Sequence, residues 1–152
     1  MLSMKAKYGL RAVLHLGAHY GRGPVLTAEL AEQERIPKKF LEQILLELKR
    51  RGLLQSRMGK NGGYLLSKSP SDVTFGAVMR ALDGPLAPVP CLNVASYERC
   101  SDCVDESCCG IRMCMQQVRD AMSAVLDKTS IADILERSAM AKQEAGAATY
   151  QI

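Results

Sequence analysis

The fold is decided by residues 37–67, which read PKKFLEQILLELKRRGLLQSRMGKNGGYLLS. Apolar side chains in the first half recur at positions i, i+3 and i+4, which predicts a helix over 37–52 that starts at a proline and stops at a glycine. The helical period then ends, and two short strands are predicted at 53–57 and 64–67. Asn61-Gly62 between the strands is the strongest short-range signal for a β-hairpin.

Two further helices are predicted ahead of this segment. Residues 3–20 have apolar side chains at helical spacing with Ser3 as the N-cap, and residues 27–34 form a short helix with Thr27 as the N-cap. Three helices followed by a hairpin is the order of a winged helix-turn-helix. The predicted fold class is therefore mainly α with a small β-hairpin wing, extended by a long C-terminal dimerisation helix.

The rest of the chain is predicted to be helical around a cysteine-rich loop. A helix over 74–82 ends at a proline-rich stretch, and a long helix begins at Gly110. Ser130 and Asp133 form the pattern of a capping box that opens a last short helix. The predicted domains are a winged helix-turn-helix head at 1–70, a dimerisation region at 71–141 with the cysteine-rich loop at 88–110, and a disordered tail at 142–152.

Charge is divided unevenly along the 152 residues. Up to residue 70 there are thirteen Lys and Arg against five acidic residues, whereas from residue 71 onward there are seven basic and eleven acidic residues. A basic head on an acidic body predicts that the head binds a polyanion such as double-stranded DNA. Because no apolar run is long enough to span a bilayer and no signal-peptide pattern is present, we expect a cytoplasmic protein without membrane contact.

The expected recognition helix and wing supply side chains that reach DNA. Lys38 and Lys39 begin the helix and are expected to contact phosphate, whereas Glu42 and Gln43 one turn later can pair with cytosine and adenine edges. The wing is expected to enter the minor groove or to follow the phosphate backbone. The predicted DNA contacts are Lys38, Lys39, Glu42, Gln43, Arg50, Arg57 and Lys60.

All six cysteines lie between residues 91 and 114. Since thiols stay reduced in the cytoplasm, such a cluster is more typical of a metal site or a redox sensor than of a disulfide framework. The irregular spacing favours an iron–sulphur cluster, [2Fe–2S] or [4Fe–4S], over zinc, and zinc over a disulfide switch alone. Cys108 and Cys114 are additional cysteines that are not expected to be ligands. The predicted metal ligands are Cys91, Cys100, Cys103 and Cys109.

The long helix that begins at Gly110 has an apolar seam suited to a second helix. Its seam residues are spaced alternately four and three apart, as in a two-stranded coiled coil. This spacing predicts a homodimer whose two recognition helices lie about 34 Å apart on a partly palindromic operator. The predicted dimerisation residues are Ile111, Met115, Val118, Met122 and Val125.

Motifs typical of enzymes are not found in the sequence. There is no nucleotide-binding glycine pattern, nucleophile elbow or carboxylate pair, so the protein is not expected to be an enzyme. His15 and His19 lie one helical turn apart, but no glutamate follows His15 as a zinc metalloprotease would require. A structural role is expected for both histidines.

Several motifs occur together along the chain, up to about residue 139. They are Leu2-Ser-x-Lys5-Ala-x-Tyr8-Gly-Leu-Arg-Ala, Ile36-Pro-Lys-Lys-Phe-Leu-Glu-Gln-Ile-Leu, Leu48-x-x-x-Gly-Leu, Gly59-Lys-Asn-Gly-Gly-Tyr64 and the loop ending Cys109-Gly-Ile-Arg. Together they resemble the Rrf-two family of bacterial transcription regulators, which includes proteins of the IscR, NsrR and CymR types. The resemblance implies a homodimeric winged helix-turn-helix repressor or activator.

The resemblance also implies a cofactor, because many family members hold an iron–sulphur cluster through three cysteines of this loop. By motif position Cys103 and Cys109 are two of these ligands, and Cys91 or Cys100 is the third. Glu42 stands where the family's cluster-assembly regulator has a glutamate that affects the choice of DNA site.

Two departures from the family pattern concern the fourth ligand. Arg112 stands where that regulator has a histidine ligand, and Lys7 stands where some members provide an acidic ligand from the partner. A fourth loop cysteine is then the simplest fourth ligand. Family members without a cluster also exist, which keeps open a regulator controlled by a thiol–disulfide switch, by a protein partner or by zinc.

Overall fold

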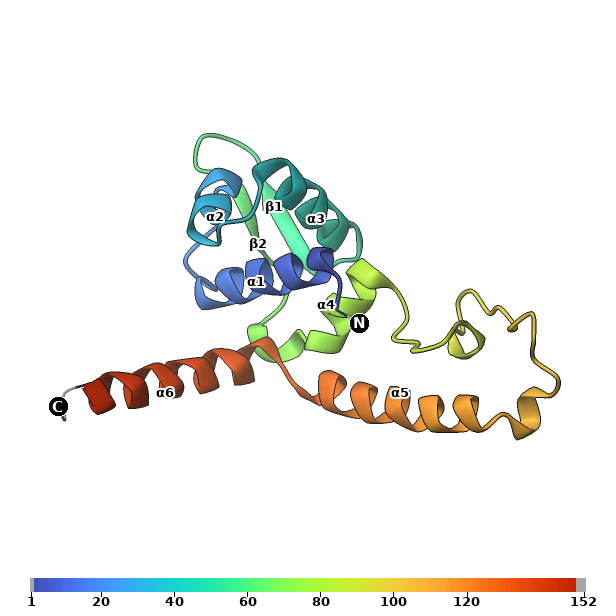
Figure 1. Cartoon of the computed structure of the whole chain (residues 1–152). Helices are drawn as coiled ribbons and strands as arrows, with labels where there is room; N and C mark the ends of the chain where they lie inside the picture. Colours follow the sequence, from blue (N-terminus) through green and yellow to red (C-terminus); the bar gives the residue numbers. More distant parts are fainter. Residues whose placement is uncertain (1, 150–152) are drawn as a thin grey trace.

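The computed structural model describes residues 2–149, and its helices and strands follow the predicted order (Figure 1). Three short 3₁₀ turns lie at Pro70–Asp72, Pro90–Leu92 and Glu106–Cys108. The helices and strands are α1 (Met4–Ala18), α2 (Thr27–Gln33), α3 (Lys38–Arg50), β1 (Leu54–Arg57), β2 (Gly63–Leu66), α4 (Phe75–Asp83), α5 (Gly110–Lys128) and α6 (Ile131–Thr149).

The first three helices begin close to their predicted starts. Ser3 caps α1, because its hydroxyl accepts a hydrogen bond from the Ala6 N–H at 2.9 Å. The prediction that Thr27 caps α2 is wrong, since Leu26 holds the extended N-cap conformation and Thr27 is already helical. Pro37 is likewise the N-cap of α3 rather than its first helical residue.

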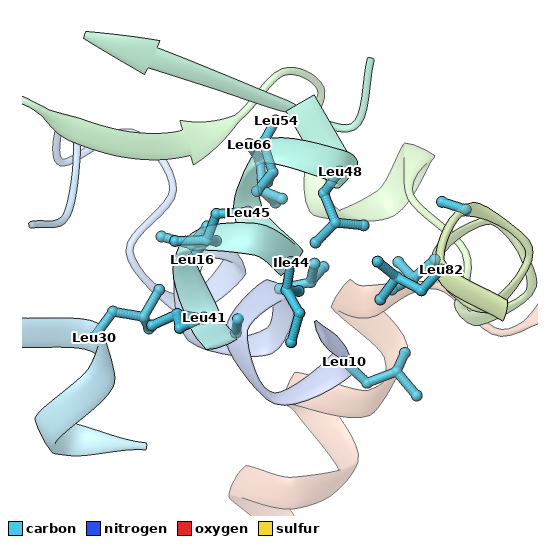
Figure 2. Close-up of a cluster of buried hydrophobic side chains, with 14 of the residues drawn as sticks. Leu10, Leu16, Leu30, Leu41, Ile44, Leu45, Leu48, Leu54, Leu66 and Leu82 are labelled. Atoms are coloured by element: carbon cyan, nitrogen blue, oxygen red, sulfur yellow. The ribbon is translucent and has the colours of Figure 1, made fainter. Parts of the chain in front are cut away.

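The hydrophobic core is centred on one face of α3. Leu41, Ile44, Leu45 and Leu48 are fully buried there, at the positions that the helical period predicts. Figure 2 shows them meeting leucines from α1, α2, both strands and α4. The buried face fixes which side chains of α3 point outward, and it therefore positions the candidate site.

The hairpin is confirmed, and its loop falls within the connection predicted between residues 57 and 64. The strands pair antiparallel from Leu54 opposite Leu66 to Arg57 opposite Gly63, which leaves a five-residue loop. The loop closes through a hydrogen bond from the Gly62 N–H to the Gly59 carbonyl, and Gly59 has the positive φ of 109°. A loop of five residues does not need the tight type I′ turn of a two-residue hairpin.

The segment before α2 adds a contact that the sequence did not predict. Val25 and Tyr64 exchange two backbone hydrogen bonds, at 2.9 and 3.0 Å, so this segment lies against β2. Gly63 permits the approach: it has a φ of 139°, and a Cβ there would lie 2.0 Å from the Val25 carbonyl oxygen. The wing is therefore fastened to the helix-turn-helix.

The core extends beyond residue 70, where the head was predicted to end. Val73, Val78 and Ile131 are fully buried in the same cluster as the α3 leucines. Leu82 of α4 packs so closely on α1 that a Cβ at Gly9 would lie 2.1 Å from its Cδ1 atom. The structural head thus includes α4 and the first turn of α6.

The junction between α5 and α6 is attached to the head by backbone hydrogen bonds. The Phe75 N–H donates to the Thr129 carbonyl at 3.0 Å, and the Ile131 N–H donates to the Val73 carbonyl at 2.8 Å. From this junction α5 and α6 run in opposite directions below the head (Figure 1). The start of α5 near residue 110 is the end farther from this attachment.

The last helix begins as predicted but is much longer than predicted. Ser130 and Asp133 form the capping box, with the Asp133 N–H donating to Ser130 Oγ at 3.0 Å and the Ser130 N–H donating to Asp133 Oδ2 at 2.8 Å. The helix continues to Thr149, so residues 142–149 of the predicted tail are helical. Residues 136–145 are mostly alanine and other strong helix formers and include no proline, which favours the extension. Residues 150–152 lie outside the described residues.

Candidate functional site

The outward face of α3 has the charged and polar side chains predicted to bind DNA. Lys38, Lys39, Glu42 and Gln43 are all exposed, and none forms a side-chain hydrogen bond or ion pair within residues 2–149. They lie opposite the buried leucines, so the packing of α3 aims them at solvent. Arg50 is exposed in the last turn of the same helix. These five side chains are therefore free to contact a ligand.

The wing presents the other two predicted DNA contacts. Arg57 ends β1 and Lys60 lies in the loop, and both are exposed and unpaired within the described part of the chain. Met58 between them is 96% exposed. Lys49 of α3, which is not among the predicted DNA contacts, donates to Ser56 Oγ of β1 at 2.5 Å. This bond connects the recognition helix to the wing.

The two histidines of α1 belong to the packing of the helix-turn-helix. The His15 side chain is 7% exposed, and its Nδ1 atom lies 2.9 Å from Glu34 Oε1 at the end of α2. Its ring stacks on that of His19 with centroids 4.5 Å apart. Arg11 also donates to the Glu34 carbonyl. These contacts hold α2 against α1, in line with the expected structural role.

The cysteine-rich loop folds around a cavity of about 320 Å³. All four predicted ligands line this cavity, which we call the cysteine pocket, and Cys108 lines it as well. Cys114 does not line it and lies exposed on α5. All six cysteines are free thiols. The pocket brings together Cys91, Cys100, Cys103 and Cys109.

The thiols of the pocket surround it without converging. Within residues 2–149 no three His, Cys, Asp or Glu side chains lie close enough together to hold one metal ion. Partial desolvation and then the neighbouring Cys91 and Asp102 raise the pKa of the Cys100 thiol above its ordinary value. Its thiol is therefore protonated at neutral pH in this arrangement. The donor set is that of an iron–sulphur or zinc site, and binding would require the loop to contract and to release protons.

Hydrogen bonds give the loop its shape. Arg99 donates to the carbonyls of Cys103 and Val104 at 3.0 and 3.1 Å. The Tyr97 hydroxyl donates to Glu106, and this bond raises the pKa of Tyr97. Each contact spans at least four residues, so the loop has defined turns despite its lack of long helices or strands.

Arg112 places a guanidinium beside the thiols. Its Nε atom is buried and has no hydrogen-bond partner, and its side chain lines the cysteine pocket. The Arg112 backbone N–H donates to Cys109 Sγ at 3.5 Å, which makes Cys109 the N-cap of α5. A guanidinium at this place offsets part of the negative charge that several thiolates would gather.

The predicted dimerisation seam of α5 is open to solvent in the single chain. No residue of α5 is buried. Ile111 is 70% exposed and Val125 is 65% exposed, and Val118 and Met122 are also exposed while Met115 is half-buried. An apolar row of this length on an exposed helix is unusual for a monomer.

The described residues include no helix that is both long enough and apolar enough to cross a bilayer.

Comparisons with known proteins identify the family. Residues 2–137 match the model of Rrf2, described as iron-dependent transcriptional regulators. An rrf2-like HTH-type transcriptional regulator of Rhodobacter capsulatus is 38% identical over 138 residues, which are 89% of this chain and 92% of that protein.

Two solved structures are similar over nearly the whole chain. CymR, the global cysteine regulator of B. subtilis, has a TM-score of 0.75 and 31% identity over 90% of this chain and 97% of its own. IscR of T. potens has a TM-score of 0.72 and 28% identity over 91% of this chain and 88% of its own. The winged helix fold is thereby confirmed, and the relatives are transcriptional regulators rather than enzymes. The protein is a DNA-binding transcriptional regulator, and it belongs to the Rrf2 family, the Rrf-two family that its motifs resemble.

Proposed function

We propose that the protein is a homodimeric, cytoplasmic regulator that binds DNA through α3 and the wing and senses redox or iron–sulphur status through the cysteine pocket. The observation that carries the proposal is that all four predicted ligand cysteines line one pocket while the charged and polar side chains on the outward face of α3 are unpaired. The family's description as iron-dependent regulators supports it. When bound, an iron–sulphur cluster supplies one-electron redox chemistry and sensitivity to oxidants.

The residues divide into the predicted roles. Lys38, Lys39, Arg50, Arg57 and Lys60 neutralise phosphates, which supplies sequence-independent affinity and orients the head. Glu42 and Gln43 point from the same face and are the candidates for reading base edges. Two heads joined through α5 would contact half-sites one turn of duplex apart, on a partly palindromic operator.

Homodimerisation is assigned to the apolar seam of α5. Burying the exposed seam of one copy against that of another would remove apolar surface from water on both helices. Its residues are Ile111, Met115, Val118, Met122 and Val125.

Four thiolates are proposed to hold the cofactor, with Arg112 beside them. Cys91, Cys100, Cys103 and Cys109 provide the soft ligands that iron–sulphur clusters require. The buried Nε atom of Arg112 lacks a partner, and a negatively charged thiolate site would provide one.

A thiol-based regulator without a cluster is the second candidate. CymR resembles this chain about as closely as IscR does, and it is described as a global cysteine regulator. In that reading pocket thiols would form a reversible disulfide or bind zinc, or a protein partner would act on the same fold.

Anaerobic purification tests the two candidates. If the protein holds a cluster, it should be brown and absorb visible light. Cys103→Ala should remove this absorption, whereas Cys114→Ala should keep it, because Cys114 lies outside the pocket. Colourless protein with stoichiometric zinc would establish the zinc site instead. Colourless, metal-free protein whose intact mass falls on oxidation and recovers with reductant would establish the disulfide switch.

A further inference from the structure

A second cavity lies between the head and α5. It has a volume of about 530 Å³ and is lined by the end of α3, by α4 and the turn after it, by the start of the cysteine-rich loop and by α5. A cavity of this size accommodates a small organic molecule. It contains none of the predicted DNA, metal or dimerisation residues. We call it the arginine pocket.

Three arginines line this pocket, from three different elements, and no acidic residue does. The exposed side chain of Arg51, at the C-terminal cap of α3, has no ion-pair partner within residues 2–149. Arg119 of α5 donates from Nε and Nη2 to one oxygen of its exposed neighbour Asp120, at 3.0 and 2.8 Å. Its remaining nitrogen is free to donate. The pocket therefore favours an anion.

The third arginine has a structural partner. Both terminal nitrogens of Arg80 donate to Asp127, at 2.5 and 2.9 Å, so this guanidinium is held in place at the pocket wall. A fixed guanidinium contributes electrostatic attraction without losing further side-chain entropy. The anion's direct hydrogen bonds are assigned to Arg51 and Arg119.

The remaining wall of the arginine pocket is apolar. Leu86, the buried Leu92 and Val94 contribute it, and the hydroxyl of Ser123 lies one helical turn beyond Arg119. A DNA backbone has no apolar group to fill such a wall, whereas a small organic anion does. We propose that the arginine pocket binds a small organic anion, a carboxylate or phosphate on an apolar group.

The pocket is connected to the regulatory parts of the molecule. A smaller cavity of about 340 Å³ shares Leu92, Val94 and Arg119 with it and continues to Cys91 and Arg112, which line the cysteine pocket. An anion bound at Arg51 would thus contact the end of the recognition helix and the wall of the loop at once. This inference does not depend on whether the cysteines hold a cluster.

Calorimetric titration with phenyl phosphate tests the proposal on the full chain. We expect saturable binding, weakened about tenfold by Arg51→Ala and by Arg119→Ala because each removes a charge-assisted hydrogen bond. Ser123→Tyr fills the cavity without changing its charge and is expected to abolish binding. Phenol provides only the apolar ring and inorganic phosphate only the anion. Both are therefore expected to bind more weakly than phenyl phosphate.

Two controls separate the arginine pocket from other basic surface. Arg22→Ala removes an exposed arginine that does not line the arginine pocket, and Lys38→Ala removes a charge from the proposed DNA-binding face. Both variants should bind phenyl phosphate within twofold of the wild-type affinity. Circular dichroism confirms that each variant is folded. Absence of saturable binding at millimolar phenyl phosphate would overturn the proposal, as would binding that is lost in Lys38→Ala but kept in Arg51→Ala and Ser123→Tyr.

Discussion

Arg80 of α4 donates hydrogen bonds from Nη1 and Nη2 to the two carboxylate oxygens of Asp127 of α5, at 2.5 and 2.9 Å. The two residues are 47 positions apart, so the pair connects the core of the head to the proposed dimerisation helix. The contact is close: a Cβ at Gly76 would lie 2.1 Å from Asp127 Oδ1. The position of α5 relative to the head depends on this pair and on the backbone bonds at Thr129 and Ile131.

Breaking this pair should have a modest effect that disappears in acid. The hydrogen bond from Arg80 lowers the pKa of Asp127, so its stabilisation is present above the unfolded value near 4 and is lost as pH falls through the folded value. Because both side chains are more than a third exposed, solvent screening limits the effect of Asp127→Asn to about 1 kcal/mol or less. Urea denaturation at neutral and acidic pH measures it. The matched variant Asp120→Asn, whose partner is its own neighbour, should change stability less.

Gly63→Ala should disrupt the wing. The added Cβ would meet the Val25 carbonyl oxygen, and the φ of 139° disfavours any residue with a side chain. Gly21→Ala is the matched control, since Gly21 also has a positive φ but has open space around its Cβ position. Gly21→Ala is therefore expected to cost only about 1 kcal/mol of backbone strain. Equal unfolding free energies for the two variants would contradict the close Val25 contact.

Duplex binding should weaken steeply with salt, and single variants should change the slope. Lys38→Ala, Arg57→Ala and Lys60→Ala each remove one proposed phosphate contact, so each should reduce the slope of log K against log salt by about 0.9. Gln43→Ala should instead keep the slope and relax preference at one base pair by about 1–3 kcal/mol. Fluorescence anisotropy over a salt series measures both. Arg137→Ala, on exposed α6, serves as a charge-matched control; a slope change as large as that of Lys38→Ala would count against the assignment to α3.

Introducing a charge into the α5 seam should produce monomers. Val118→Asp would bury a carboxylate in an apolar helix pair, which is unfavourable without a partner charge. Sedimentation velocity should show a dimer for wild type and a monomer for this variant. Tyr20→Asp alters another exposed apolar residue, on the head, and should remain dimeric. A dimeric Val118→Asp protein would exclude the proposed seam.

The sequence predicted the elements whose signals are local. The helical period of 37–52, the Ser3 cap, the Ser130 capping box and the start of α5 each depend on residues a few positions apart, and the structure contains them all. The order of these elements was enough to predict a winged helix. Asn61-Gly62 predicted that a hairpin forms, and the pairing of both strands then sets its register, with Arg57 opposite Gly63.

The features that escaped prediction involve residues far apart in the chain. The bridge between Val25 and Tyr64 and the arginine pocket exist only once the chain is folded. The cysteine cluster was visible because its members are close in sequence. Which of them share a pocket, and that Arg112 accompanies them, required the tertiary arrangement.

The attachment of α5 at one end makes it a lever arm. Its hydrogen-bonded end lies at Thr129, and its 19 residues extend about 28 Å to Gly110, beside the cysteine pocket. A tilt of about 5° around the fixed end would displace the far end by about 2 Å, a movement comparable to helix shifts in known switches. If the loop contracts around a bound group, as proposed, it would pull where the arm is longest, so little force at the cysteines would be needed to turn the proposed dimerisation helix.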